Sequence, residues 1–188
     1  IICNSHHLDD FKGLLGNGKQ WGVEIQYKCQ PSPDGIAQAF LLGKDFLEDK
    51  NVVLILGDNL FYGNNLENYL KIANQEKKGA TIFVYPVSNP SRYGIVNFDE
   101  NTNKVVSFVE KPSNPKSNYA VTGLYFFDNK VINYAENLVP SERNELEITD
   151  IINRYLSDNN LKLQILGTGI AWLDTGTFRS LMQASHYV

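Results

Sequence analysis

Short apolar runs of β type alternate with longer helical patterns along most of this chain. The clearest run, residues 52–56, is continuous and consists of β-branched residues and leucine. Such a run is typical of a central parallel strand that is covered on both faces. A helical pattern of apolar residues follows it over residues 66–73. This β-α-β-α alternation predicts a doubly wound α/β sheet.

The remaining segments extend the alternation and add a hairpin. We expect further strands at residues 1–3, 25–29, 81–85, 119–127 and 163–166, and further helices at 36–47, 131–138, 148–156 and 178–187. Residues 94–98 and 105–109 flank a polar turn and predict a β-hairpin. The fold class is therefore α/β, with a mixed, mainly parallel sheet flanked by helices, in a single domain over residues 1–188.

The composition suits a globular domain with a hydrophobic core. Hydrophobic residues make up 43% of the chain and charged residues 20%, and the formal net charge is -4. This balance gives no broad electrostatic reason to bind nucleic acid or an anionic membrane. No apolar run approaches the roughly 18 residues of a membrane span. Cys3 and Cys29 are interpreted as buried free thiols, which favours a reducing cytoplasm over a disulfide framework.

Acidic residues occupy positions where open α/β sheets bind ligands, outside the carboxyl ends of strands. Asp58 and Asn59 follow the 52–56 run, and Asp174 precedes the last helix. Taken singly, Asp58 fits a turn that bonds to its own backbone, and Asp174 fits a helix N-cap. Two strand-end carboxylates together are what one Mg²⁺ that bridges substrate phosphates needs. We expect Asp58 and Asp174 to approach each other and share one Mg²⁺.

Five further positions could contact a substrate, and for three of them a purely structural interpretation is also open. Glu110 could accept hydrogen bonds from sugar hydroxyls and Lys111 could contact a phosphate, or the two could form a solvated pair of little energetic value. Tyr93 and the Gly94 backbone could meet a sugar ring. Arg143 could reach a phosphate, although an exposed structural arginine is the commoner case.

Gln30 ends a predicted strand just before a proline-rich turn. A side-chain amide carries a donor and an acceptor side by side, which matches the N3–H and carbonyl edge of thymine or uracil. A polar residue that simply ends a strand is an equally open interpretation. If Gln30 reads the pyrimidine edge, its loss should weaken selection against purine nucleotides.

Seven segments, taken in order, resemble the bacterial glucose-1-phosphate thymidylyltransferases, which are sugar-phosphate nucleotidyltransferases. The segments are QPSPDG (30–35), LGDNLFYG (56–63), RYG (92–94), EKP (110–112), AVTGLY (120–125), ELEITD (145–150) and WLDTG (172–176). They cover nearly the whole chain. Each segment is weak evidence, but the ordered set is specific.

The resemblance implies a Rossmann-like nucleotidyltransferase fold in a cytoplasmic homo-oligomer. It also implies a reaction in which dTTP and glucose-1-phosphate give dTDP-glucose and pyrophosphate, with Mg²⁺ as cofactor. The implied roles are thymine contact for Gln30 and Gly35, metal binding for Asp58 and Asp174, the glucosyl site for Asn59, Tyr93, Gly94, Glu110 and Val121, and catalytic contact with the sugar phosphate for Lys111 and Arg143.

The sequence departs from the family's pattern at one place. The family opens with a strand and a glycine-rich loop that binds the triphosphate, and no Gly-Gly-x-Gly-Thr-Arg segment is present here. Residues 1–3 instead match the family's second parallel strand. We therefore expect a catalytic domain truncated at its N-terminus and also after its last helix, and we expect the 188-residue chain alone to be inactive.

Three alternatives stay open. A UTP-using uridylyltransferase would read a base that lacks one methyl group, worth about 0.8 kcal/mol if buried, so the sequence does not separate the two. A nucleotide-sugar glycosyltransferase is disfavoured because the strand end reads Gly57-Asp58-Asn59 and not Asp-x-Asp. A non-catalytic sugar-nucleotide binding module is favoured only by the missing loop.

Overall fold

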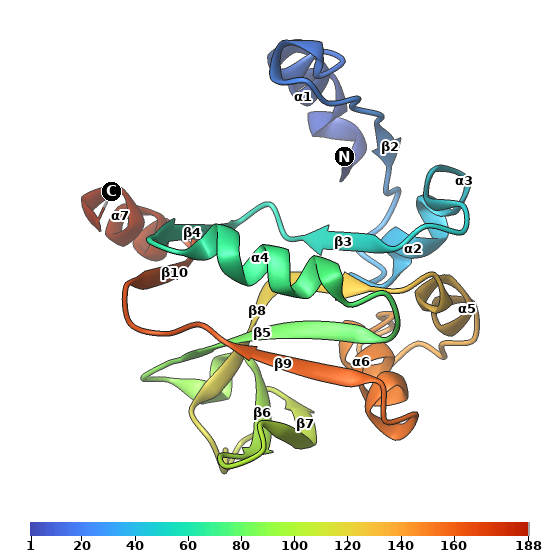
Figure 1. Cartoon of the computed structure of the whole chain (residues 1–188). Coiled ribbons are helices and arrows are strands. Elements are labelled where there is room, and N and C mark those ends of the chain that lie inside the picture. Colours follow the sequence, from blue (N-terminus) through green and yellow to red (C-terminus); the bar gives the residue numbers. More distant parts are fainter. Residues whose placement is uncertain (188) are drawn as a thin grey trace. The chain divides into compact units, whose positions relative to one another are not determined.

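The computed structural model describes residues 1–187 (Figure 1), and these residues fall into two compact units. The first unit holds residues 1–49 and 131–151, and the second holds residues 50–130 and 152–187. The division falls within helix α6 (Ile148–Ser157). The single catalytic domain expected over the whole chain stays a prediction.

The first unit is mainly helical and carries one short pair of strands. Strands β1 (Ile2–Cys3) and β2 (Lys28–Cys29) run parallel, and both cysteines are free thiols. The helices are α1 (Leu8–Leu15), α2 (Gln38–Leu42), α3 (Lys44–Leu47), α5 (Lys130–Glu136) and the first turn of α6. The predicted strand at 25–29 is therefore shorter than expected, and the predicted helix at 36–47 divides at Gly43, which caps α2.

The second unit is built on a six-stranded mixed sheet. Its strands are β3 (Val52–Ile55), β5 (Ala80–Pro86), β6 (Gly94–Asp99), β7 (Lys104–Glu110), β8 (Tyr119–Phe127) and β9 (Leu161–Ile165). A separate antiparallel ribbon is formed by β4 (Asn59–Gly63) and β10 (Ile170–Asp174). Helices α4 (Leu66–Gln75) and α7 (Phe178–Tyr187) complete the unit. Among the helices of residues 1–187, none is long and apolar enough to cross a membrane.

Strand β8 organises the sheet, because it pairs antiparallel with β3, β5 and β6. The strand order is β7-β6-β8-β5-β9, with β3 also on β8, and β5 runs parallel to β9. The predicted α/β class and mixed sheet are confirmed. The expectation of a mainly parallel sheet is wrong, since an apolar run reports how a strand is buried and not in which direction its neighbours run.

Strand β3 departs from its prediction in burial as well. Val53 is 43% exposed and Ile55 is 61% exposed, while Val52 and Leu54 are half-buried. The strand was expected to be covered on both faces. Its side chains alternate between two faces, and the exposed Val53 and Ile55 lie on the same one, so this face is open while the other is partly covered.

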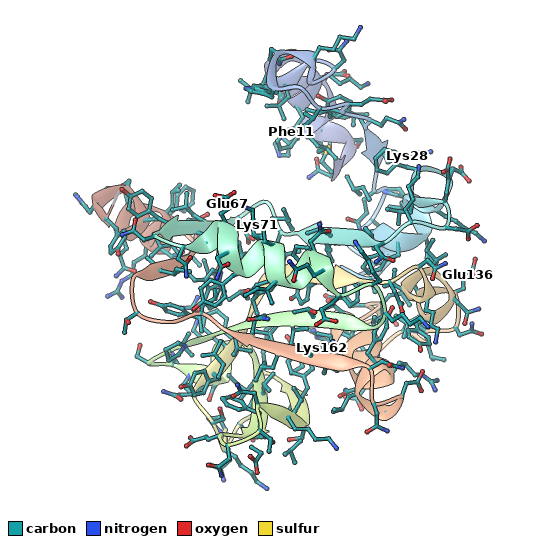
Figure 2. All side chains as sticks on the ribbon, viewed as in Figure 1. Phe11, Lys28, Glu67, Lys71, Glu136 and Lys162 are labelled. Atoms are coloured by element: carbon teal, nitrogen blue, oxygen red, sulfur yellow. The ribbon has the colours of Figure 1, made fainter. Side chains whose placement is uncertain are left out.

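The core of the second unit lies between the sheet and helix α4. Phe83 and Leu124 of the sheet and Leu166, directly after β9, form a buried cluster with Ala73 of α4, and Leu66, Tyr69 and Leu70 of α4 pack against it. On the solvent side of the helix, Glu67 and Lys71 (labelled in Figure 2) form an ion pair one turn apart. Helix α4 is therefore amphipathic in the way its sequence predicts.

A buried carboxylate joins the end of β8 to helix α6. Asp128 is 6% exposed and accepts hydrogen bonds from the Tyr155 hydroxyl (2.6 Å), the Gly79 N–H (2.7 Å) and the Lys130 N–H (3.2 Å). The Tyr155 ring is fully buried and stacks against Phe127. These three donors offset the cost of removing the carboxylate from water.

Tyr155→Phe should lower the free energy of unfolding by about 1–3 kcal/mol, because it removes one donor from a buried carboxylate and leaves the ring in place. Urea unfolding of the protein that contains this chain measures the change. Tyr62→Phe is the matched control, since this hydroxyl belongs to a tyrosine that is 53% exposed, and its effect should stay within about 0.5 kcal/mol. Equal effects of the two substitutions would contradict a stabilising role for the Tyr155 hydroxyl.

Candidate functional site

The ribbon of β4 and β10 brings the two predicted metal carboxylates together. Asp174 ends β10 opposite Asn59, the first residue of β4, and Asp58 directly precedes Asn59. A methyl group added at Gly176 would lie 3.1 Å from Asp58 Oδ2 and 3.2 Å from Asp174 Oδ1. The two carboxylates therefore face one small space. Their approach is as predicted, and their metal role stays a prediction.

This donor set fits a hard divalent cation. Mg²⁺ is usually held by one or two carboxylates, and phosphate and water complete its octahedron. Within residues 1–187 no group of three or more His, Cys, Asp and Glu side chains is arranged to hold a metal ion. A cation held by Asp58 and Asp174 would therefore complete its coordination with other oxygens, such as those of water or of a substrate phosphate.

Asn59 is held by contacts from two other strands. Its Oδ1 accepts hydrogen bonds from the Gly123 N–H of β8 (2.9 Å) and from the Trp172 indole N–H of β10 (2.5 Å). Its Nδ2 donates to Asp58 Oδ1 (2.8 Å). Because a backbone N–H and an indole N–H can only donate, the Asn59 amide must turn its oxygen toward them and its NH₂ toward Asp58. Asn59, expected in the glucosyl site, thus also orients a predicted metal ligand.

The Asn59 side chain supplies an acceptor to the backbone at one edge of β8. Near Ala120 this edge pairs with β6, and from Leu124 onward it pairs with β3. Gly123 lies between these two pairings. Its carbonyl accepts the Leu56 N–H (2.8 Å), and its own N–H has the Asn59 side chain as acceptor. The Asn59 amide therefore satisfies a backbone donor that the neighbouring strands leave open.

Trp172 belongs to the quoted WLDTG segment but received no role from the sequence. It is 8% exposed and packs edge-on against Tyr93 (5.4 Å between ring centroids) and Tyr85 (6.1 Å). Trp172 and Asp174 are two residues apart in β10, so their side chains share one face of the strand. That spacing was the signal in the sequence that could have found it.

The Tyr93 hydroxyl lies close to Asp174. Burial raises the pKa of the Tyr93 hydroxyl, and the charge of Asp174 and a hydrogen bond to it raise this pKa further, whereas Arg92 lowers it. The net effect keeps the hydroxyl protonated, so it can donate to the carboxylate. Tyr93 was expected to line a glucosyl site, and the structure adds this contact with a predicted metal ligand.

The pair Glu110 and Lys111 lies beside Tyr93. Glu110 is opposite Gly94 in the β6–β7 hairpin, and its Oε2 would be 3.0 Å from a methyl group at Gly94. The Lys111 N–H donates to the Tyr93 carbonyl (3.0 Å), and its ammonium group is 3.6 Å from Glu110 Oε1. Lys111 has a φ of 41°, uncommon for a residue with a side chain. This conformation interrupts strand alternation and lets two consecutive charged side chains meet.

Val121 and Tyr125 lie on β8 beside these groups. Val121, expected in the glucosyl site, is 7% exposed, so it can offer a ligand only a small apolar surface. Burial raises the pKa of the Tyr125 hydroxyl strongly, and the charges of Glu110 and Asp58 add to the rise. Tyr125 is thus a neutral hydroxyl near the charges of Glu110 and Asp58, and no pattern in the sequence singled it out.

The first unit holds the other three predicted site residues, Gln30, Gly35 and Arg143. The Gln30 side-chain NH₂ donates to Gln38 Oε1 (2.8 Å) and to the Gly35 carbonyl (3.3 Å). Gly35 has a φ of +103°, and a methyl group there would meet the Leu146 backbone at 2.3 Å. Glycine is therefore required at position 35 by the fold itself, whatever its role toward a nucleotide.

Arg143 already contacts two carboxylates. Its guanidinium donates to Glu147 through Nε (3.2 Å) and Nη2 (2.8 and 2.9 Å to the two oxygens), and Nη2 is 3.7 Å from Glu145. A phosphate at Arg143, as the sequence predicts, would share the guanidinium with these groups. Its contact with a phosphate stays a prediction.

Gly123→Ala should displace the Asn59 amide, because the new methyl group would lie within 2.6–2.7 Å of its atoms. The Trp172 indole N–H then loses its acceptor, so its NMR signal should shift upfield and exchange faster with water. Trp21, which is 55% exposed, provides a second indole signal that should not change. Gly57→Ala is the matched control, since a methyl group there meets nothing within 4 Å. An unchanged Trp172 signal in Gly123→Ala would contradict the bond to Asn59.

Known proteins resemble this chain over its full length. Glucose-1-phosphate thymidylyltransferase from Neisseria meningitidis serogroup A is 53% identical over 188 residues, and that from Mycolicibacterium smegmatis is 49% identical. In both cases the chain spans 65% of the relative's length. A crystal structure from Bacillus anthracis, assigned as a glucose-1-phosphate thymidylyltransferase in complex with a sucrose, matches all of this chain and 74% of its own, with a TM-score of 0.90 at 40% identity.

A more distant structure, UDP-glucose pyrophosphorylase with UDP-glucose, has a TM-score of 0.82 at 19% identity and covers 98% of this chain and 76% of its own. That likeness concerns the fold alone. These neighbours confirm the predicted Rossmann-like nucleotidyltransferase fold. Enzymes of this kind generally use a divalent metal ion. The nucleotidyl transferase family model matches residues 1–188, so the chain belongs to the nucleotidyl transferase family.

Proposed function

We propose that the protein containing this chain transfers a thymidylyl group from dTTP to glucose-1-phosphate, with dTDP-glucose and pyrophosphate as products. The observation that carries the proposal is the pair Asp58 and Asp174, whose oxygens both lie about 3 Å from one point beside Gly176. Relatives that bear this activity in their name are 43–53% identical over the chain. Two converging carboxylates suit a cation that contacts substrate phosphates.

The reaction needs positioning and positive charge more than proton transfer. A phosphate oxygen of glucose-1-phosphate, already anionic at neutral pH, would attack the α-phosphorus of dTTP, and the bond to pyrophosphate would break. No general base is needed for this step, so catalysis reduces to in-line alignment and charge neutralisation. Lys111 and Arg143 are the cations that we assign to the sugar phosphate. Glu145 and Glu147 would keep Arg143 in place for that contact.

The metal ion in this proposal is Mg²⁺. When bound, Mg²⁺ would neutralise charge on the phosphates that react. Asp58 and Asp174 would hold it, Asn59 would orient Asp58 through its NH₂, and Tyr93 would donate to Asp174. These supporting contacts keep both carboxylates aimed at the space beside Gly176.

The remaining predicted residues divide between the sugar and the base. Tyr93, Gly94, Glu110 and Val121 would surround the glucosyl group together with Asn59, and Glu110 would accept hydrogen bonds from its hydroxyls. Gln30 and Gly35 would contact thymine. We further propose a cytoplasmic homo-oligomer with residues 1–188 within a single catalytic domain.

The test is product analysis with the protein that contains this chain. Incubation with dTTP, glucose-1-phosphate and Mg²⁺ should release pyrophosphate and form dTDP-glucose, detected by anion-exchange chromatography. Exchange of labelled pyrophosphate into dTTP should require dTDP-glucose. Product from UTP at an equal or greater rate would favour the uridylyltransferase alternative. Transfer of glucose from dTDP-glucose to an acceptor, without pyrophosphate exchange, would replace the proposal with a glycosyltransferase.

Asp58→Asn and Asp174→Asn should each lower kcat/KM for dTDP-glucose formation by at least about a hundredfold, because a bound metal ion supplies several kcal/mol of charge stabilisation. Titration with Mn²⁺, followed by its EPR signal, should show weaker binding by both variants. The free energy of unfolding should change by less than about 1 kcal/mol. Asp45→Asn, at an exposed position on α3, is the control and should match the wild type. Wild-type Mn²⁺ affinity in both variants would remove the metal assignment.

A further inference from the structure

Gln30 stands at one end of a chain of polar side chains that ends in a carboxylate. Gln30 Nε2 donates to Gln38 Oε1 (2.8 Å), and Gln38 Nε2 donates to Asp34 Oδ2 (2.8 Å). Ser32 Oγ also donates to Asp34 Oδ2. Gln30, Asp34 and Gln38 are all partly buried, and all of these residues lie in the first unit. We call this set of four side chains the Gln30 relay.

The chemistry of Asp34 fixes the direction of every bond in the Gln30 relay. A carboxylate can only accept, so Gln38 must turn its NH₂ toward Asp34. Gln38 then presents its Oε1 to Gln30, so Gln30 must donate to it with its own NH₂. The Gly35 carbonyl, which also only accepts, takes the second bond from the same nitrogen (3.3 Å). Both donors of Gln30 are therefore used within the fold.

The side-chain oxygen of Gln30, Oε1, is the part of its amide that remains available to a ligand. Within the described chain, every fully buried side-chain nitrogen or oxygen has a hydrogen-bond partner. The side-chain hydrogen bonds of Gln30 all leave from Nε2, so its Oε1 is not fully buried and is reachable from solvent. An amide held in this way acts as an acceptor toward a base and not as a donor–acceptor pair.

We propose that Asp34 and Gln38 are positioning residues that present Gln30 Oε1 to the nucleobase and so select pyrimidines with a ring N–H over cytosine. The inference rests on the proposed function in taking Gln30 as the base contact. Thymine and uracil carry a hydrogen at N3 and can donate to Oε1. Cytosine carries a lone pair at N3, so two acceptors would face each other in the same pose. Asp34 and Gln38 act through Gln30 and touch no substrate.

The experiment compares dTTP with dCTP in the protein that contains this chain. Two measurements are made for each variant: kcat/KM for each triphosphate with glucose-1-phosphate, and the dissociation constants of dTDP and dCDP by calorimetry. The ratio between the two bases is the readout, because a merely structural disturbance lowers both values together and leaves their ratio unchanged.

Asp34→Asn should lower the preference for thymine over cytosine, in kcat/KM and in binding, by about tenfold, in line with the cost of an unpaired polar group. Asparagine can donate as well as accept, so the amides of Gln38 and Gln30 can both turn over. Adding Gln38→Glu to Asp34→Asn should restore the wild-type ratio. The glutamate accepts the asparagine NH₂ and again presents only an acceptor to Gln30.

Two controls complete the design. Ser32→Ala removes a donor to Asp34 but leaves its carboxylate in place, so the ratio should not change. In a Gln30→Ala background, Asp34→Asn should have no further effect on the ratio, as expected when one residue acts through another.

The outcomes separate the inference from the proposed function. A wild-type protein that binds dTDP over dCDP but forms no dTDP-glucose would end the proposed function and leave the Gln30 relay supported by its binding ratios. An unchanged ratio in Asp34→Asn, or no rescue by Gln38→Glu, would overturn the relay while dTDP-glucose synthesis stands. Equal binding of dTDP and dCDP by the wild type, or no binding of either, would also overturn it.

Discussion

The amide of Asn59 is the contact on which the candidate site of the second unit depends. Two groups that can only donate, the Gly123 N–H and the Trp172 indole N–H, converge on its oxygen and leave its NH₂ for Asp58. The bond from the Gly123 N–H also satisfies the edge of β8 between the segment that pairs with β6 and the segment that pairs with β3. The Asn59 side chain thus accepts a backbone hydrogen bond of the sheet and also orients the Asp58 carboxylate. A contact that stabilises the fold therefore also positions a candidate site residue.

In the first unit, too, neighbouring groups determine which way a side-chain amide points, but there the determining group is an acceptor. At Asn59 obligate donors set the direction of an amide, whereas at Gln30 the obligate acceptor Asp34 sets it through Gln38. An amide alone is indifferent to being turned over, because its two ends are nearly equal in shape. A neighbour whose hydrogen-bonding sense cannot change removes this ambiguity. Specific recognition by an amide therefore requires such a neighbour.

The sequence predicted well those features that are recorded in periodic patterns. The strands at 81–85 and 119–127, the 94–109 hairpin and helix α4 were found within a few residues. The ribbon of β4 and β10 was not predicted, because its segments contain the candidate site residues Asn59 and Asp174 and were interpreted as turns or loops. The meeting of Asp58 and Asp174 was predicted from strand ends alone. Trp172 was missed because its bond to Asn59 joins positions 113 residues apart.

Close packing around glycine gives a physical reason for several residues that the motifs contain. At Gly123 and Gly176 the space that a side chain would fill is taken by Asn59 in one case and by both carboxylates in the other. These glycines are needed for the room they leave. A motif such as WLDTG therefore records a geometry as well as a chemistry: the aspartate supplies charge, the tryptophan fixes the neighbouring amide, and the glycine keeps open the space into which both carboxylates point. An enzyme that works by positioning charged groups needs all three at once.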